Sequence, residues 1–139
     1  MAPRVAYRQP QAGGQGFART KKVFGGPVLT LTAADVALNA QTAIMRVPKG
    51  FVLMSWSGTV GDIDSGATLM LAIGDAGNNA RFMAASNIGQ AGAALPALAA
   101  GGVLYEFTDD TDILLTATVA AAGLAATPTI NVLMEGYMK

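Results

Sequence analysis

The chain has 139 residues and a formal net charge of zero, and it contains neither cysteine nor histidine. This length suits one domain with a substantial core, while the missing residue types exclude disulfides, zinc sites of the usual ligands and most nucleophile–base pairs, so we expect no enzyme, no metal site and no cofactor. Only 13% of the residues are charged, about half of the roughly 25% typical of soluble domains, which indicates that much of the surface faces other protein.

The first 26 residues, MAPRVAYRQPQAGGQGFARTKKVFGG, contain five of the nine basic residues and no acidic residue. The zero net charge therefore divides into a segment of +5 and a remainder of −5, which has four bases against nine acids. Prolines and glycines interrupt the segment, and its apolar residues follow neither a helical nor a strand period. This composition predicts an extended arm that takes its shape only against a neighbouring subunit.

Nine residues of this arm are candidate partner-binding residues. Its apolar side chains are expected to be buried on docking, and its basic side chains to select the register through ion pairs. The apolar candidates are Val5, Tyr7, Phe17 and Phe24, and the basic candidates are Arg4, Arg8, Arg19, Lys21 and Lys22. Nucleic acid fits the arm less well than protein does, because five charges are few and the negative remainder would repel a polyanion.

From residue 27 onward, short segments of β type alternate with turn residues. We expect seven or eight strands and little helix, with one possible helical turn at 33–43, a choice between strand and helical turn left open at 81–86, and a loop at 91–102. The expected strands are 27–34, 43–47, 51–60, 67–74, 103–107, 112–119 and 128–138. This spacing predicts an all-β, antiparallel β-sandwich over residues 27–139, with a jelly roll as its commonest eight-stranded form, preceded by the extended basic arm of residues 1–26.

Segment 51–60 is the most apolar of these strands. Strict alternation predicts that Val52, Met54, Trp56 and Val60 share one of its faces. Trp56 is the only tryptophan of the chain, and we expect it in the core or in a subunit contact.

Two long uncharged stretches, 82–105 and 113–134, raise the question of a membrane. Each is interrupted by proline and glycine, so neither is a credible spanning helix of about 20 apolar residues. The N-terminal bases are not followed by an apolar run, so no signal peptide is expected either.

Two acidic loops are the remaining candidates for a site. In GDIDSG, Asp62 and Asp64 have the spacing that begins some calcium loops, but a polar turn whose carboxylate accepts backbone N–H bonds explains the spacing equally, and whether this loop binds an ion stays open. The second loop holds Glu106, Asp109 and Asp110, followed by Asp112. It is either a solvated loop tip or a docking surface for a neighbour's basic arm.

Residues from about 47 to the C-terminus resemble a known family. The segments VPKGFVLMSWSGTVGDIDSGATLMLAIGD, RFMAASNIGQAG, YEFTDDTDILLTATVAAA and TINVLMEGYMK are similar in order to those of small virion proteins of tailed bacteriophages. These proteins share a Gly-led strand, an Asp-x-Asp-[Ser/Thr]-Gly loop, a strand ending in Gly-Asp and a Thr-rich final hairpin. The resemblance covers about two-thirds of the chain, leaves out the arm and carries no catalytic motif.

The resemblance implies a structural virion protein, most often a head decoration protein with a jelly-roll fold. We therefore expect a capsid decoration or cement protein, made in the host cytoplasm and located on the head surface of the phage particle. Its expected partners are the major capsid protein or other virion subunits and further copies of itself, a trimer being the favoured oligomer. The alternatives are a tail, neck or fibre-attachment component and a carbohydrate- or calcium-dependent binding module.

Overall fold

A computed structural model describes residues 21–139, and the predicted partner-binding residues Arg4, Val5, Tyr7, Arg8, Phe17 and Arg19 lie outside the described residues. The strands of the described part are β1 (Lys21–Gly25), β2 (Leu29–Thr30), β3 (Gln41–Val47), β4 (Phe51–Val60), β5 (Met70–Gly74), β6 (Met83–Ser86), β7 (Ala93–Ala94), β8 (Thr111–Val119) and β9 (Thr129–Met138). Three short 3₁₀ turns connect them, namely η2 (Ala33–Val36), η3 (Ile88–Gln90) and η4 (Ala100–Gly102).

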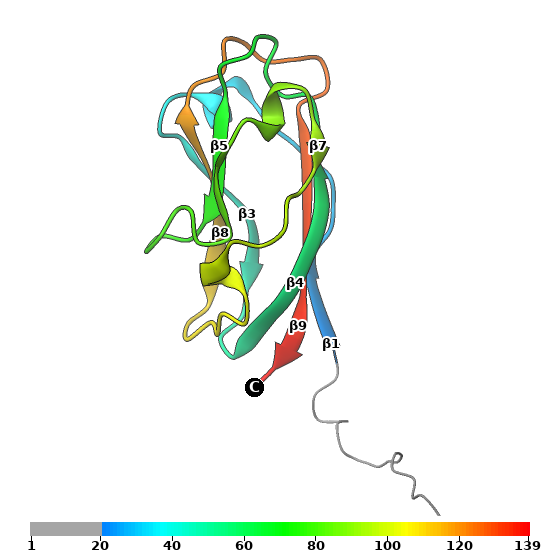
Figure 1. The fold of residues 1–139 in the computed structure, drawn as a ribbon, viewed down its shortest axis with the longest axis vertical. Helices are drawn as coiled ribbons and strands as arrows, with labels where there is room; N and C mark the ends of the chain where they lie inside the picture. The colour runs from blue at the N-terminus through cyan, green and yellow to red at the C-terminus, as the bar shows by residue number, and fades with distance from the viewer. Residues whose placement is uncertain (1–20) are drawn as a thin grey trace, which may run out of the picture.

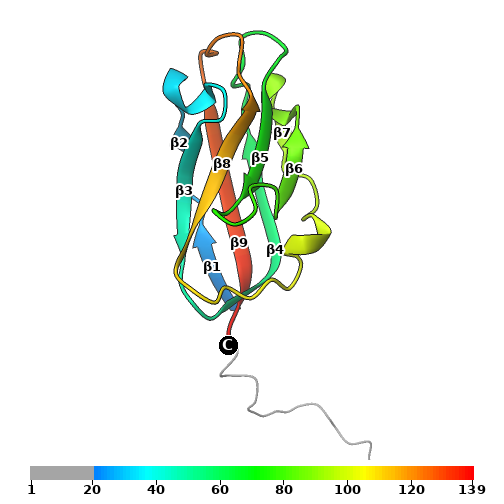
Figure 2. The ribbon, with the colours of Figure 1, turned by 90° about the vertical axis from the view of Figure 1, so that its left-hand side faces the viewer.

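The described strands form two antiparallel sheets, which lie face to face (Figures 1 and 2). The five-stranded sheet has the order β1–β9–β4–β7, with β2 also paired to β9, and the four-stranded sheet has the order β3–β8–β5–β6. Strand β2 pairs with β9, β3 with β8, β4 with β7 and β5 with β6, so the chain folds as one long hairpin. Pairing of β4 with β9 and of β5 with β8 rolls this hairpin into two layers. The result is a jelly roll, which confirms the predicted fold.

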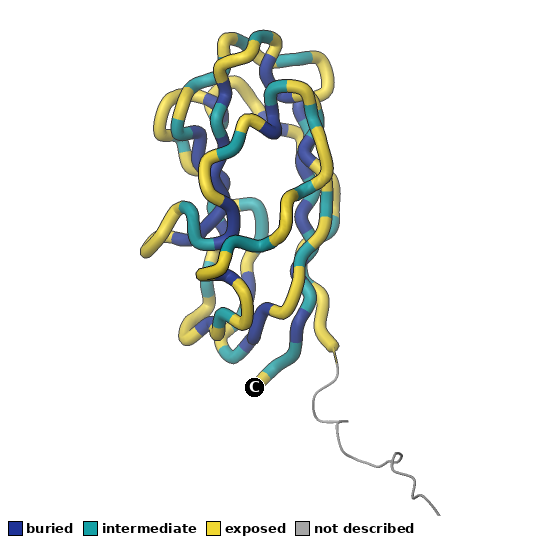
Figure 3. The backbone as a smooth tube through the Cα atoms, in the orientation of Figure 1, coloured by how far each residue is buried: buried dark blue, intermediate teal, exposed yellow. Residues whose placement is uncertain are grey.

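The core lies between the two sheets, where Figure 3 shows buried backbone on the strands of both layers. Alternation along β9 buries Ile130, Val132 and Met134, as the sequence predicts. Aromatic rings fill the end of the core near the C-terminus, with neighbouring centroids 5.0 to 6.0 Å apart. These rings belong to Phe51, Phe82, Tyr105 and Phe107.

Two predicted strands and one predicted loop differ in the structure, since the loop expected at 91–102 contains strand β7 and the 3₁₀ turn η4. The strand expected at 27–34 is reduced to the two residues of β2, because the chain then turns into η2, the helical turn considered at 33–43. The segment 81–86, left open between strand and helical turn, contains strand β6 at Met83–Ser86. Segment 103–107 is not a strand: Leu104 has a φ of 58°, which breaks the extended conformation, and only an isolated bridge joins Glu106 to Val52.

Strand β4 departs from strict alternation. A bulge between Leu53 and Ser55 inserts one extra residue opposite β9 and reverses the inward and outward positions that follow. Met54 is therefore exposed, whereas Trp56 packs against the core and Val60 is buried. The prediction that Val52, Met54, Trp56 and Val60 share one face was wrong, because a bulge leaves no signal in the pattern of apolar residues.

Strand β1 lies in the segment predicted as the arm. It pairs antiparallel with β9 of its own chain along all five residues, from Lys21 to Gly25. The Phe24 ring packs edge to face on Phe51, with centroids 4.9 Å apart. The sandwich therefore includes Lys21–Gly25, which lie before the predicted boundary at 27, and Phe24 packs on the core of its own chain.

Replacing Phe24 by alanine is expected to lower the free energy of unfolding by about 2 kcal/mol, less than for a fully buried phenylalanine because this ring is half-buried. Urea unfolding of the full chain measures the change. Lys22→Ala is the matched control on the same strand, since Lys22 is exposed and its loss should change stability by less than about 0.5 kcal/mol. Equal stability of F24A and the unaltered chain would contradict this role for Phe24.

Candidate interaction surfaces

Asp64 is the central residue of the GDIDSG loop, and its carboxylate is 1% exposed. It accepts four backbone N–H bonds of 2.8 to 2.9 Å, from Gly66, Thr68, Leu69 and Ala122. Burial alone would raise the pKa of Asp64, but these N–H donors hold it well below its usual value. This is the predicted polar turn, because the lone pairs that a cation would use are already occupied by N–H groups.

Asp62, the other aspartate of this loop, is exposed. Within residues 21–139, no three acidic side chains lie close enough together to hold a metal ion.

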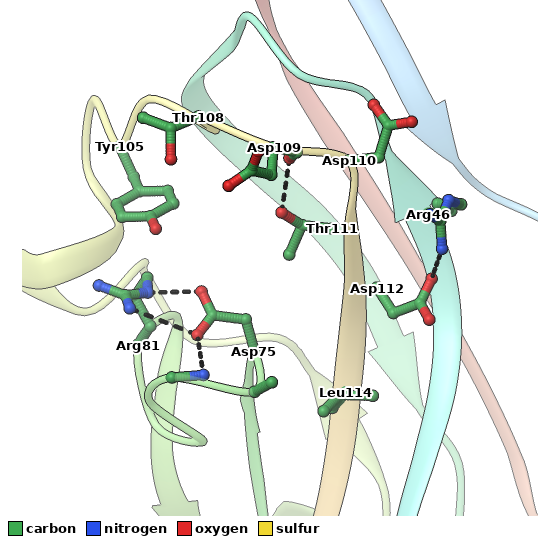
Figure 4. A pocket seen from close by; sticks show the side chains of 12 residues that line it. Arg46, Asp75, Arg81, Tyr105, Thr108, Asp109, Asp110, Thr111, Asp112 and Leu114 are labelled. Carbon is green, nitrogen blue, oxygen red and sulfur yellow. Dashed lines mark hydrogen bonds and ion pairs between the residues drawn. The ribbon is translucent and has the colours of Figure 1, made fainter.

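A polar hollow of about 410 Å³ lies beside the acidic loop at the end of the sandwich near the C-terminus (Figure 4). On one wall, Arg81 donates from Nε to Asp75 Oδ2 at 2.6 Å, and its guanidinium stacks over the Tyr105 ring at 4.4 Å. Burial would raise the pKa of Asp75, but Arg81 and the backbone N–H groups of Asn78 and Gly77 lower it. Asp75 and Arg81 thus form a paired structural group that fixes this wall.

The opposite rim of the hollow is the acidic loop. Asp112 pairs with Arg46 at 2.8 Å, and Asp110 accepts a bond from the Lys49 backbone N–H at 2.9 Å. Asp109 is exposed at the rim, as Figure 4 shows. The acidic loop therefore lies at the rim of this hollow, and part of its charge is already compensated within the chain.

A second surface is apolar and lies along β4. Met54, Ser55, Trp56, Ala97, Leu98 and Val103 line a cleft of about 280 Å³. The Trp56 indole forms its wall, donating from Nε1 to the Pro96 carbonyl oxygen at 2.8 Å. Trp56 also packs against the core, so it meets the expectation of a core residue while keeping one side in this cleft.

The predicted partner-binding residues within the described part, Lys21, Lys22 and Phe24, all lie on β1. Lys21 forms an ion pair of 3.1 Å with Glu135 of β9, while Lys22 is exposed. None of the three lines the polar hollow or the apolar cleft. The exposed apolar residues of the cleft were not predicted from the sequence, because alternation places Met54 on the same face as Trp56, and Val103 is expected in a strand.

The described residues contain no helix long and apolar enough to cross a membrane. No protein-family model and no curated protein matches the chain. Two solved structures contain chains of similar fold. One, from the capsid asymmetric unit of cyanophage Pam1, has a TM-score of 0.68 and 26% sequence identity over 99% of both chains. The other, from the capsid of Ralstonia phage GP4, has a TM-score of 0.67 and 23% identity over 98% of this chain and 91% of that one. The chain thus has the fold of phage capsid chains, in agreement with the resemblance in its sequence.

Proposed function

We propose that this chain is a structural protein of a phage virion, and specifically a decoration or cement protein of the head surface. The observation that carries the proposal is the similarity to a Pam1 capsid chain over 99% of both chains. Because the coverage is complete on both sides, the likeness is to a separate small capsid chain of this size rather than to a domain inserted in a larger one.

A mechanical role agrees with the chemistry of the described residues. The two buried carboxylates, Asp64 and Asp75, are both engaged in structural hydrogen bonds. Eight large apolar side chains of the described residues are exposed, which favours contact with protein. The sandwich would act as a rigid body that sits against neighbouring subunits of the shell.

The residues before Lys21 would link this body to an adjacent subunit. Arg4, Arg8 and Arg19 carry the three positive charges of this segment, which contains no acidic residue. Ordering the segment costs on the order of 1 kcal/mol per residue in backbone entropy, so its contacts must be extensive. Each link can still be weak, because many identical links repeated over a shell add up.

Deleting residues 1–20 is the direct test, because the deletion ends before β1 and leaves the sheet intact. The truncated chain should melt at the same temperature as the full chain. It should bind particles that lack the protein at least tenfold more weakly, as measured by co-sedimentation. The matched control keeps 20 residues of the same composition in scrambled order. It should also bind weakly if binding depends on the order of the residues in the arm.

Binding by the truncated chain as tight as that of the full chain would refute the role of the arm. A reconstruction of the particle tests the location itself. A head protein should appear in many symmetric copies over the shell, whereas a tail or neck component should appear in few copies at one vertex.

A further inference from the structure

The outer edge of β4 is covered by two separate segments with a gap between them. At one end, the Leu95 N–H donates to the Gly58 carbonyl oxygen at 3.0 Å. At the other end, Leu53 exchanges bonds with Leu104 and Tyr105, at 2.8 and 3.0 Å. Between these points the described chain has no backbone hydrogen bond from residues 54–57 to the segment 95–105.

The backbone of Trp56 faces this gap. In an antiparallel strand, the N–H and C=O of every second residue point to the same side. Gly58 directs its carbonyl to the outer edge, so Trp56, two residues earlier and beyond the bulge, directs its N–H and C=O there as well. One residue of β4 thus offers a donor and an acceptor to a further extended segment.

The gap coincides with the apolar cleft, and its surroundings are apolar and exposed. Met54 is 55% exposed and Val103 50%, and Leu104, the residue after Val103, is 60% exposed. No charged side chain lines the cleft. Such a concentration of exposed apolar side chains at a strand edge favours an extended occupant that brings apolar side chains of its own.

Leu104 adds a further observation, because its φ of 58° is left-handed. This conformation costs a non-glycine residue roughly 1 kcal/mol. A glycine at this position would avoid the cost, yet the chain has a leucine here, two residues after Gly102. Backbone strain held by hydrogen bonds on an exposed apolar residue is typical of binding sites. The strained turn follows directly on Val103, which lines the cleft.

We propose that this cleft receives the segment before Lys21 of a neighbouring copy of the chain, as an extended strand along the open edge of β4. Strands β1 and β7 are at opposite edges of the same sheet. Copies placed side by side therefore bring the start of β1 of one copy to the open edge of the next. The segment contains Val5, Tyr7 and Phe17, which suit the apolar walls.

The length of the segment permits this exchange. Twenty extended residues span up to about 66 Å, whereas the ten residues of β4 span about 34 Å. Contacts of this head-to-tail kind form a closed ring when the rotation between successive copies completes a full turn. The inference rests on one part of the proposed function, namely that the N-terminal residues contact another subunit, and it names that subunit and the residues that receive them.

Cysteine cross-linking of the full chain tests the exchange, because the chain contains no cysteine. Tyr7→Cys and Phe17→Cys chains are each mixed with a Met54→Cys chain carrying a tag and then oxidised. At least one mixture should form tagged–untagged disulfide dimers tenfold faster than the same mixtures with Leu38→Cys. Leu38 is the matched control, since it is 63% exposed but lies beside β8 in the other sheet.

Two results of these mixtures would overturn the proposal: a rate of tagged–untagged dimer formation no higher than with L38C, or a predominance of dimers between two M54C chains. A third contrary result would come from single chains that carry both cysteines, F17C/M54C or Y7C/M54C, if they form an intramolecular disulfide at a rate independent of concentration. Dimers between two M54C chains would indicate that two β4 edges face each other. An intramolecular disulfide would indicate that each chain fills its own cleft.

Leu104→Gly provides a second measurement. It removes the apolar side chain and the strained conformation together, so the cross-linking rate should fall at least tenfold while the melting temperature stays equal or rises. Val28→Ser, at an exposed valine outside the cleft, should change neither. An L104G chain that cross-links at the original rate contradicts the proposal. These experiments use no particles, so they are independent of the test of the proposed function. If the chain fails to cross-link but still binds particles, this inference is refuted and the proposed function stands.

Discussion

Replacing Asp64 by alanine is expected to lower the free energy of unfolding by at least about 3 kcal/mol. The carboxylate joins its own loop to the loop between β8 and β9, where it accepts the Ala122 N–H. Without it, four backbone N–H groups lose their acceptor in a place that excludes most water, and each buried unpaired donor costs about 1–3 kcal/mol. Relaxation of the two loops and entry of water limit the total. Urea unfolding followed by circular dichroism measures it.

Two variants separate the bonds of Asp64 from other effects. Asp62→Ala removes an exposed carboxylate from the same loop and should change stability by less than about 0.5 kcal/mol. Asp64→Asn keeps the shape but replaces one acceptor oxygen by an amide nitrogen that cannot accept these bonds. The asparagine variant should therefore also be clearly less stable. If D64N matches the unaltered chain at neutral pH, the hydrogen bonds of Asp64 do not stabilise the two loops.

The pH dependence of stability gives an independent test. The pKa of Asp64 is lowered in the folded chain, and an aspartate in the unfolded chain has a pKa of about 3.9. Its contribution is therefore fully present above about pH 5 and is lost as the pH falls through and below 3.9. The stability difference between the unaltered chain and D64N should shrink by about 1 kcal/mol between pH 7 and pH 3. A difference independent of pH would contradict the charged, hydrogen-bonded carboxylate.

The fold was largely predictable from the sequence because its strands follow local rules. Alternation in β9 and turn residues such as those of GDIDSG mark where strands run and end, and the jelly roll follows from their number and spacing. Strand β1 was not predictable in this way. Its sequence, KKVFG, continues the basic composition of the preceding residues, and its partner β9 lies more than a hundred residues along the chain. Composition alone cannot show such a distant pairing.

The apolar cleft was harder to predict than the fold for a related reason. It depends on the bulge after Leu53 and on the left-handed Leu104, two backbone features that place apolar residues on the surface. Alternation places Met54 on the same face as Trp56, and the apolar composition of VLYEF predicts a strand. Both errors have one cause, since irregular backbone is imposed by tertiary hydrogen bonds rather than by the residues themselves.

Gly136 is the residue through which β9 accommodates the bulge of β4. It lies opposite Leu53 in β4 and opposite Lys22 in β1, so it is central in the sheet. Glycine in a central strand is usually unfavourable and marks a bulge or a close approach of backbone. Here a Cβ atom would overlap the Val52 carbonyl oxygen and lie 2.9 Å from the Phe51 ring.

Gly136→Ala is therefore expected to lower the free energy of unfolding by about 3 kcal/mol, at the upper end for overpacked positions. The added methyl group must move either the β4 backbone or Phe51, whose ring is fully buried in the aromatic cluster. Gly101→Ala is the matched control, because its Cβ would meet nothing closer than 3.7 Å, and it should change stability by less than about 0.5 kcal/mol. If G136A is as stable as G101A, the β4 backbone can move away from the added methyl group without a loss of stability. The exposure of Met54, and with it the geometry of the cleft, would then not be fixed by the contact of Gly136 with β4.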